Sequence, residues 1–129
     1  MSTIKTPPIR KLRLKAGDIV TAALPQVDGK TKDRPALVLR YMPTGQFLAC
    51  AITTQLHKII PEFEEIIRSS DEDFSKTGLK ADSLIRVTAL AVFQPNDENV
   101  RRIIGHINPI LHQKLLSNLC KYLIQDPNL

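Results

Sequence analysis

Short runs of apolar residues, separated by proline, glycine and charged residues, follow one another along most of the chain. Runs of this length that are rich in Val, Ile and Leu and end at turn-forming residues are typical of β-strands. The polar stretch 69–76 is predicted to be a loop with a helical turn. We predict strands over residues 19–24, 35–41, 46–54, 82–92 and 102–106, and a weaker strand over 62–67 whose acidic side chains face water.

The segment 33–39 places an arginine and a proline directly before a continuous apolar run. Pro35 suits the first position of a strand, where its missing N–H breaks no ladder. Arg34 is therefore expected at the mouth of that strand. Residues 25–33 are predicted to form a polar loop that is longer than a tight hairpin needs. A long loop beside a rigid strand is a frequent location of functional residues.

Proline and glycine between the second and third predicted strands indicate an antiparallel hairpin. The turn is Pro43-Thr44-Gly45. Such a hairpin returns the far end of the third strand to the start of the second. We therefore expect Thr53 and Thr54 to lie near Arg34.

One arginine, Arg86, interrupts the apolar sequence of the predicted strand 82–92. Burying a guanidinium group costs free energy unless the group meets water, an acid or a ligand. Two interpretations remain open. Either Arg86 has such a partner inside the fold, or it lies on the solvated face of an alternating strand.

A helix is predicted after the last strand. Asn108 is a favourable N-cap residue, and Pro109 suits the first helical position. Strands followed by one terminal helix predict a mainly β domain, in which the helix packs on a small, strongly curved sheet or barrel. The face that packs on the sheet is predicted from apolar residues at helical spacing: Leu111, Leu115, Leu116, Leu119, Leu123 and Ile124.

The chain of 129 residues fits one domain, and its apolar fraction of 43% is sufficient for a core. Tryptophan is absent and aromatic residues are few, so the core is expected to be aliphatic. No apolar run is long enough to span a membrane, and no signal-peptide pattern is present. We expect a cytoplasmic protein without a membrane partner.

The net charge of +5 is carried by the N-terminal segment. We predict a flexible basic arm over residues 1–15 and a single domain over 16–129. The arm either binds phosphate groups or is a leader that only aids solubility. It contains no acidic residue and five basic ones: Lys5, Arg10, Lys11, Arg13 and Lys15.

Cysteines and histidines show no metal-binding spacing. Cys50 and Cys120 lie in apolar segments and are predicted to be buried thiols. His106 and His112 are expected to face solvent or the start of the helix. We predict neither a metal site nor a cofactor.

Five segments, taken in order, resemble the MazF/PemK family of toxin endoribonucleases, in its PemK-like branch. The order and spacing agree over residues 16–124. The resemblance implies an SH3-like barrel with a C-terminal helix, a homodimer, and an antitoxin protein as partner. It also implies metal-independent cleavage of single-stranded RNA at short sequences, by attack of a ribose 2′-hydroxyl on the adjacent phosphate. The segments are Gly17–Val20, Arg34–Leu39, Ala49–Gln55, Asp82–Val87 and Ile104–Pro109.

By the same resemblance, Arg34, Thr53 and Arg86 are the catalytic residues. Guanidinium groups and a hydroxyl suit a transition state that gathers negative charge on phosphoryl oxygens. Splayed single-stranded bases are also the form of RNA that proteins read most easily. We predict that a further set of residues near these three binds RNA: Lys30, Lys32, Thr54, Gln55 and His57.

The general base is not identified by these motifs. Some PemK-type members have an acid two positions after the strand arginine, where this chain has Thr88. Asp28 and Asp33 in the first loop are candidates to activate the hydroxyl. A loop acid beside lysine and arginine is, however, commonly a solvated ion pair.

Two other functions are compatible with the same resemblance. One is a binding module for RNA or protein that has lost catalysis. The other follows the related CcdB branch, whose members poison DNA gyrase through a C-terminal Trp-Gly-Ile. The absence of tryptophan and the ending Pro127-Asn128-Leu129 disfavour the second.

Overall fold

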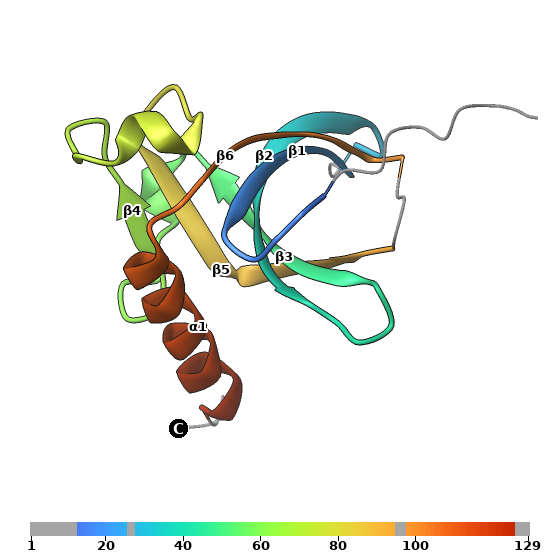
Figure 1. The fold of residues 1–129 in the computed structure, drawn as a ribbon. Coiled ribbons are helices and arrows are strands. Elements are labelled where there is room, and N and C mark those ends of the chain that lie inside the picture. Colours follow the sequence, from blue (N-terminus) through green and yellow to red (C-terminus); the bar gives the residue numbers. More distant parts are fainter. Residues whose placement is uncertain (1–12, 26–27, 95–97, 126–129) are drawn as a thin grey trace, which may run out of the picture.

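The computed structural model describes residues 13–25, 28–94 and 98–125, which form one antiparallel sheet and a C-terminal helix. The six strands lie in the order β4-β5-β3-β2-β1-β6, and Figure 1 shows them bending into a strongly curved sheet. The predicted mainly β architecture is confirmed. The elements are β1 (Asp18–Pro25), β2 (Thr31–Tyr41), β3 (Phe47–Thr53), the 3₁₀ helix η1 (Leu56–Lys58), β4 (Glu65–Ile67), the 3₁₀ helix η2 (Phe74–Thr77), β5 (Ser83–Phe93), β6 (Val100–His106) and α1 (Pro109–Ile124).

The first hairpin is longer, and its loop shorter, than the sequence predicts. Strands β1 and β2 pair from Ile19↔Leu37 to Pro25↔Thr31, so the predicted entry of β2 at Pro35 is wrong. The polar residues 31–33 are exposed strand residues rather than loop residues. The pairing of β2 with β3 ends at Ala36↔Ala51. Pro35 therefore lies where β2 has lost one neighbour, a position at which a missing N–H is tolerated.

The second hairpin has the predicted form. Strands β2 and β3 pair antiparallel through pairs such as Leu37↔Cys50 and Tyr41↔Phe47. Gly45 closes the turn at a φ of 91°, a left-handed conformation that favours glycine. The loop 69–76 is also confirmed, because its helical turn is η2.

Buried apolar residues form a cluster on each face of the sheet. One cluster lies between the strands and α1 and includes Ile52, Ile85 and Leu115. The other includes the small residues Ala22, Ala36 and Ala49 of β1, β2 and β3, together with valines and the stacked rings of Phe47 and Phe93. Since alternate residues of a strand face opposite sides, both faces of the central strands are apolar. The core is mainly aliphatic, as predicted, but it also contains three buried phenylalanines, Phe47, Phe63 and Phe93.

Helix α1 begins as predicted. The side chain of Asn108 accepts a hydrogen bond from the Ile110 N–H at 2.7 Å and donates one to Asp73 at 2.8 Å. Leu115 and Leu119 are buried. The predicted burial of Leu123 and Ile124 is wrong, because 63% and 85% of these residues is exposed. The sheet does not extend to the last turn of the helix, so this end of the apolar stripe has no surface to pack against.

Two glycines allow η2 to pack against β6 backbone to backbone. A Cβ atom added to Gly105 would overlap the main chain of Lys76 and Thr77. A Cβ added to Gly78 would overlap the main chain of Ile104. This contact fixes the loop that joins β4 and β5 to the far edge of the sheet.

The predicted arm lies mostly outside the described residues. Of its positions only 13–15 are described, and there Leu14 packs against the cluster of small residues. The backbone N–H of Lys15 donates to the buried carboxylate of Asp18 at 2.9 Å. No helix in the described ranges is long and apolar enough to cross a membrane.

Cys50 is buried, as predicted, whereas the prediction of a buried Cys120 is wrong. Cys120 lies on α1, on a side of the helix that does not face the sheet. Burial, and then the charge of Glu64, raise the pKa of the Cys50 thiol far above its ordinary value. Cys50 is therefore a core residue and not a nucleophile.

Candidate functional site

The strand register places the three predicted catalytic residues on one face of the sheet. Ala36 pairs with Ala51, and Ala51 pairs with Arg86, so these residues lie in one row across β2, β3 and β5. Arg34 and Thr53 are each two residues along from that row, and residues two apart share a face. The expected proximity of Thr53 and Arg34 thus follows from the observed register.

The hydroxyl of Thr53 is oriented by the backbone. Its oxygen accepts a hydrogen bond from the Gln55 N–H at 3.1 Å. A hydroxyl that accepts in this way keeps its own hydrogen to donate. Thr53 and Arg34 are both half-buried, so each residue packs partly against the fold and is partly open to solvent. This geometry suits the binding of an anionic oxygen.

Arg86 has a partner inside the fold, which decides between the two interpretations of its sequence pattern. Its Nε lies 3.5 Å from Oε1 of Glu64. That distance is at the upper limit for a hydrogen bond, so the contact acts chiefly through charge. The Arg86 side chain is 26% exposed, whereas that of Glu64 is fully buried.

Glu64 is the functional candidate that the sequence analysis missed, and its predicted place in a solvated strand is wrong. Strand β4 begins only at the next residue, and Glu64 itself is 2% exposed. Oε1 accepts from the Ile60 N–H at 3.0 Å, and Oε2 accepts from the Thr88 hydroxyl at 2.7 Å and from its N–H at 3.3 Å. The position of Arg86 among apolar strand residues indicated that it needs a partner, but only the β4–β5 pairing shows that this partner is Glu64.

The predicted RNA-binding residues all lie at exposed positions. Lys32 lies two residues from Arg34 on the same face of β2 and is exposed. The remaining four are also exposed and belong to the β1–β2 loop or to the segment after β3: Lys30, Thr54, Gln55 and His57.

The two candidate bases have local partners. Asp28 accepts a hydrogen bond from the Lys30 N–H at 2.9 Å within the β1–β2 loop. Asp33 forms an exposed ion pair with Arg101 of β6 at 3.5 Å. Because Asp33 is adjacent to Arg34 in a strand, its side chain lies on the opposite face of β2. The register therefore does not bring Asp33 to the face that carries Arg34.

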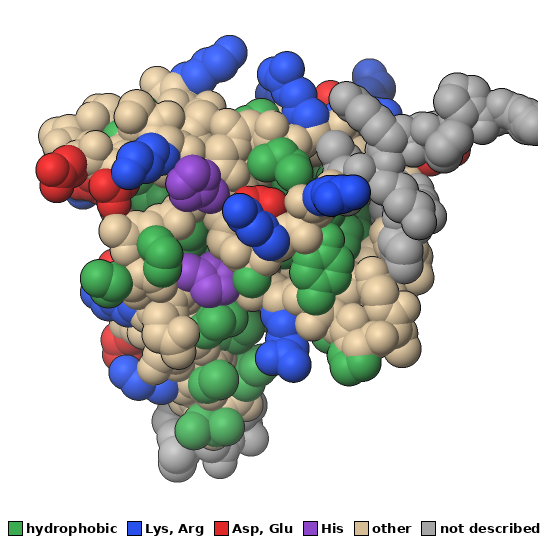
Figure 2. Space-filling model, in the orientation of Figure 1, with side chains coloured by type: hydrophobic (Ala, Val, Ile, Leu, Met, Phe, Trp, Pro, Cys, Tyr) green, Lys and Arg blue, Asp and Glu red, His purple; other side chains and the backbone are tan. Residues whose placement is uncertain are grey.

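Basic side chains do not form a continuous patch on the face seen in Figure 2. Lysines and arginines lie singly there, among acidic side chains and neutral surface. This agrees with a net charge that is concentrated in the N-terminal segment of the sequence. An anion on the face seen in Figure 2 would therefore meet individual cations and not a basic patch.

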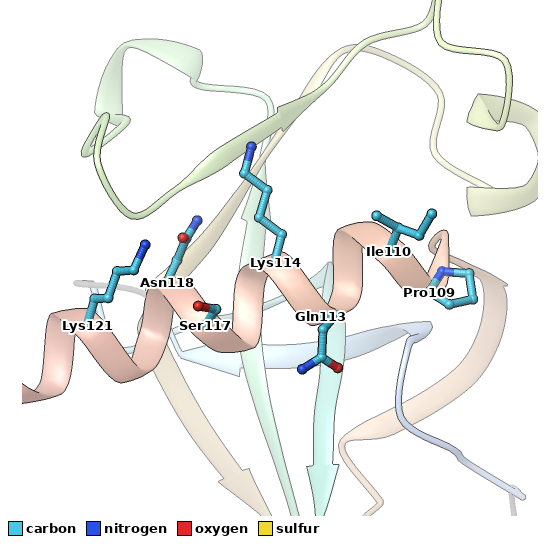
Figure 3. A pocket seen from close by; sticks show the side chains of 7 residues that line it. All are labelled: Pro109, Ile110, Gln113, Lys114, Ser117, Asn118 and Lys121. Atoms are coloured by element: carbon cyan, nitrogen blue, oxygen red, sulfur yellow. The ribbon is translucent and has the colours of Figure 1, made fainter.

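A surface hollow of about 560 Å³ lies on α1 and not at this face of the sheet. Figure 3 shows its lining side chains projecting from the one helix. Lys114 is tied to Glu65 of β4 at 3.3 Å. The hollow gathers no set of groups suited to catalysis. Its lining is Pro109, Ile110, Gln113, Lys114, Ser117, Asn118 and Lys121.

Among the described residues, no group of three or more His, Cys, Asp or Glu side chains is arranged to hold a metal ion. His112 is half-buried, and its Nε2 lies 3.1 Å from the Leu39 carbonyl oxygen. His106 is exposed. These placements agree with the expectation that both histidines face solvent or the start of the helix.

The sequence matches a family model over residues 15–123, described as the PemK-like, MazF-like toxin of a type II toxin–antitoxin system. No curated protein matches the chain significantly.

Solved structures share the fold at low sequence identity. An endoribonuclease in complex with its cognate antitoxin, from a mycobacterial species, has a TM-score of 0.61 at 16% identity, covering 87% of this chain and 97% of that one. The Mycobacterium tuberculosis toxin MazF-mt6 has a TM-score of 0.61 at 20% identity, covering 84% and 98%. The MazE–MazF complex from Deinococcus radiodurans has a TM-score of 0.61 at 19% identity, covering 88% and 97%.

Proposed function

The chain belongs to the PemK-like, MazF-like toxins of type II toxin–antitoxin systems, and we propose that it is an endoribonuclease that cleaves single-stranded RNA sequence-selectively and without a metal ion. The family model and the endoribonuclease among the structures of the same fold support this proposal. The observation that carries it is the common sheet face shared by two arginines and an oriented hydroxyl.

In the proposed reaction, a ribose 2′-oxygen attacks the adjacent phosphorus and the bond to the 5′-oxygen breaks. The products are a 2′,3′-cyclic phosphate and a 5′-hydroxyl; one proton leaves the attacking oxygen and one is delivered to the leaving oxygen. Arg34 and Arg86 clamp the phosphoryl oxygens, where negative charge increases in the transition state. Thr53 donates a further hydrogen bond to the same group.

Proton transfer is the part of the mechanism with the fewest candidates. Asp28 lies in an exposed loop at the end of the β1–β2 ribbon and stays a proposed base. Asp33 is a weaker proposal, because it is paired with Arg101 and lies on the other face of β2. The exposed set of Lys30, Lys32, Thr54, Gln55 and His57 is proposed to hold the flanking nucleotides.

We further propose an antitoxin protein as partner and a homodimer as the assembly. A cognate antitoxin is present in two of the structures of the same fold, the mycobacterial endoribonuclease complex and the Deinococcus MazE–MazF complex. A binding segment of the antitoxin would compete with RNA for the same sheet face. Size-exclusion chromatography with light scattering tests the homodimer directly.

Cleavage of a long, mixed-sequence single-stranded RNA in EDTA tests the enzymatic proposal. We expect discrete fragments that end in 2′,3′-cyclic phosphate, and a loss of rate on the order of 10² to 10³ for Arg34→Ala. Arg40→Ala is the matched control, because Arg40 is an exposed arginine on the same strand, and it should cleave as the wild type does. Intact RNA with the wild-type protein, or cleavage only after metal is added, would refute the proposed chemistry.

A binding module without catalysis is the second candidate function. The burial of Glu64 favours this function. Glu64 is the acid beside Arg86, but its side chain is fully buried, so it does not reach substrate and does not serve as a general base. RNA that is bound by the wild-type protein but not cleaved, with weaker binding by Arg34→Ala, would support this function.

The N-terminal basic segment is proposed to add affinity for phosphate groups. Each cation that neutralises a phosphate contributes to the salt dependence of binding. Removing residues 1–12 takes away three basic residues, Lys5, Arg10 and Lys11. We expect weaker RNA binding and a flatter plot of log affinity against log salt concentration. An unchanged slope would show that the segment is only a leader.

A further inference from the structure

We infer that Glu64 is a positioning residue for RNA cleavage, which holds the guanidinium of Arg86 in the orientation that receives the phosphate. The inference rests on the proposed endoribonuclease function and names a residue that the family motifs do not include. Glu64 acts through Arg86 and does not itself touch the substrate.

Burial excludes direct contact of Glu64 with RNA. Its side chain is fully buried, and its two oxygens accept from the Ile60 N–H, the Thr88 N–H and the Thr88 hydroxyl in addition to facing Arg86. A carboxylate that is enclosed and bonded in this way does not remove a proton from a ribose hydroxyl. Its remaining effect on the site is the electrostatic hold on Arg86.

The guanidinium of Arg86 contacts Glu64 through Nε, while its terminal nitrogens are left available to a ligand. Nε faces Glu64 at 3.5 Å. Within the described ranges, no other protein group bonds to its terminal nitrogens Nη1 and Nη2, and the side chain is partly exposed. A guanidinium is a planar fork of donors, so fixing the Nε edge also fixes the direction of the two terminal groups. These groups are then oriented before a phosphate arrives.

The fold explains why an acid is present at this point. The β3–β5 register passes from Cys50↔Leu90 to Ala51↔Arg86, so residues 87–89 of β5 have no partner on β3. The pairing Glu65↔Ile85 places Glu64 beside this irregular stretch. Glu64 bonds to the main chain and side chain of Thr88 there. The same carboxylate therefore fixes both the bulge of β5 and the arginine that precedes it.

The test is a double-mutant cycle on kcat and KM for a short RNA substrate, using Glu64→Gln, Arg86→Ala and the double variant. Glu64→Gln keeps the shape and removes the charge. We expect it to lower kcat about 10²-fold, as misplacement of a catalytic group by about 1 Å does. KM should change much less, because the lost contact acts in the transition state. In the Arg86→Ala background the same substitution should have no further effect on kcat.

The control and the contrary outcomes separate positioning from folding. Glu62→Gln makes the same chemical change at an exposed position two residues away, and it should leave kcat unchanged. Rates are normalised to the folded fraction from circular dichroism. If the losses from Glu64→Gln and Arg86→Ala multiply, or if Glu64→Gln is fully active, the inference is wrong. If Glu64→Gln does not fold, Glu64→Asp, which keeps the charge and withdraws it by one methylene, replaces it in the cycle.

A second measurement distinguishes failure of the inference from failure of the proposed function. The hydrogen on Nε of Arg86, followed by ¹⁵N NMR, should exchange slowly with water in the wild type. It should exchange at least about 10-fold faster in Glu64→Gln, because its protection depends on the contact with the Glu64 carboxylate. A wild-type protein that leaves RNA intact overturns the endoribonuclease, and with it the catalytic role. Equal exchange in the two proteins overturns the positioning, whatever the activity.

Discussion

Replacing Thr88 by valine tests the buried carboxylate on which the site depends. The Thr88 hydroxyl donates to Glu64 Oε2 at 2.7 Å, and this carboxylate has no access to water. A hydrogen bond to a charged group contributes about 1.5–3 kcal/mol. The methyl group of valine recovers at most about 0.8 kcal/mol, because the position is only half-buried. Thr88→Val should therefore destabilise the fold by about 1–2.5 kcal/mol, although valine and threonine have similar shapes and strand preferences.

Urea unfolding followed by circular dichroism measures this effect. With slopes of about 1–3 kcal/mol per molar, the midpoint should fall by roughly 1 M. The matched control is Thr88→Ser, which keeps the hydroxyl and loses the methyl group, at a cost of at most about 0.8 kcal/mol. The expected order of stability is wild type, then Thr88→Ser, then Thr88→Val. If Thr88→Val is as stable as the wild type, or more stable than Thr88→Ser, the bond to Glu64 does not hold the fold as described.

Three further predictions follow from separate features of the fold. Gly105→Ala should destabilise the protein by about 1–3 kcal/mol or more, since the new methyl group overlaps the main chain of η2; an unchanged thermal midpoint would contradict the packing of β6 on η2. A thiol reagent should label Cys120 in the native protein and Cys50 only after unfolding, because Cys50 is buried and its pKa is raised; mass spectrometry of digested protein shows which thiol reacted. Hydrogen bonds from the backbone and side chain of Ser69 lower the pKa of Asp82. The charged carboxylate therefore stabilises the fold at pH values above the ordinary pKa of about 3.9, and this stabilisation is lost as the pH falls below it. The difference in unfolding free energy between wild type and Asp82→Asn should shrink between about pH 5 and 2, and a constant difference would exclude this linkage.

Local patterns were sufficient for most of the elements. Strand runs, the Pro43–Gly45 turn and the Asn108-Pro109 helix start depend on residues that are neighbours in sequence, and the structure has them close to where they were predicted. The predictions were wrong at positions where the extent of the sheet determines whether a residue is exposed. Residues 31–33 are polar because the β1–β2 ribbon extends beyond the core, and polarity alone made them look like a loop. Leu123 and Ile124 continue the helical stripe past the edge of the sheet.

The site divides in the same way. The sequence by itself determined that Arg34 and Thr53 lie on the same end of the β2–β3 hairpin, because a short turn returns β3 along β2, and both residues lie two positions beyond the last pair, Ala36↔Ala51. It also determined that Arg86 needs a partner, because an arginine among apolar strand residues is costly alone. Only the tertiary structure decided that the partner is Glu64, since the β4–β5 register and the bulge of β5 join residues far apart in the chain. The local sequence predicted that the Glu64 carboxylate faces water. Strand pairing buries it, and a pattern of neighbouring residues does not show which distant strand will pack over a side chain.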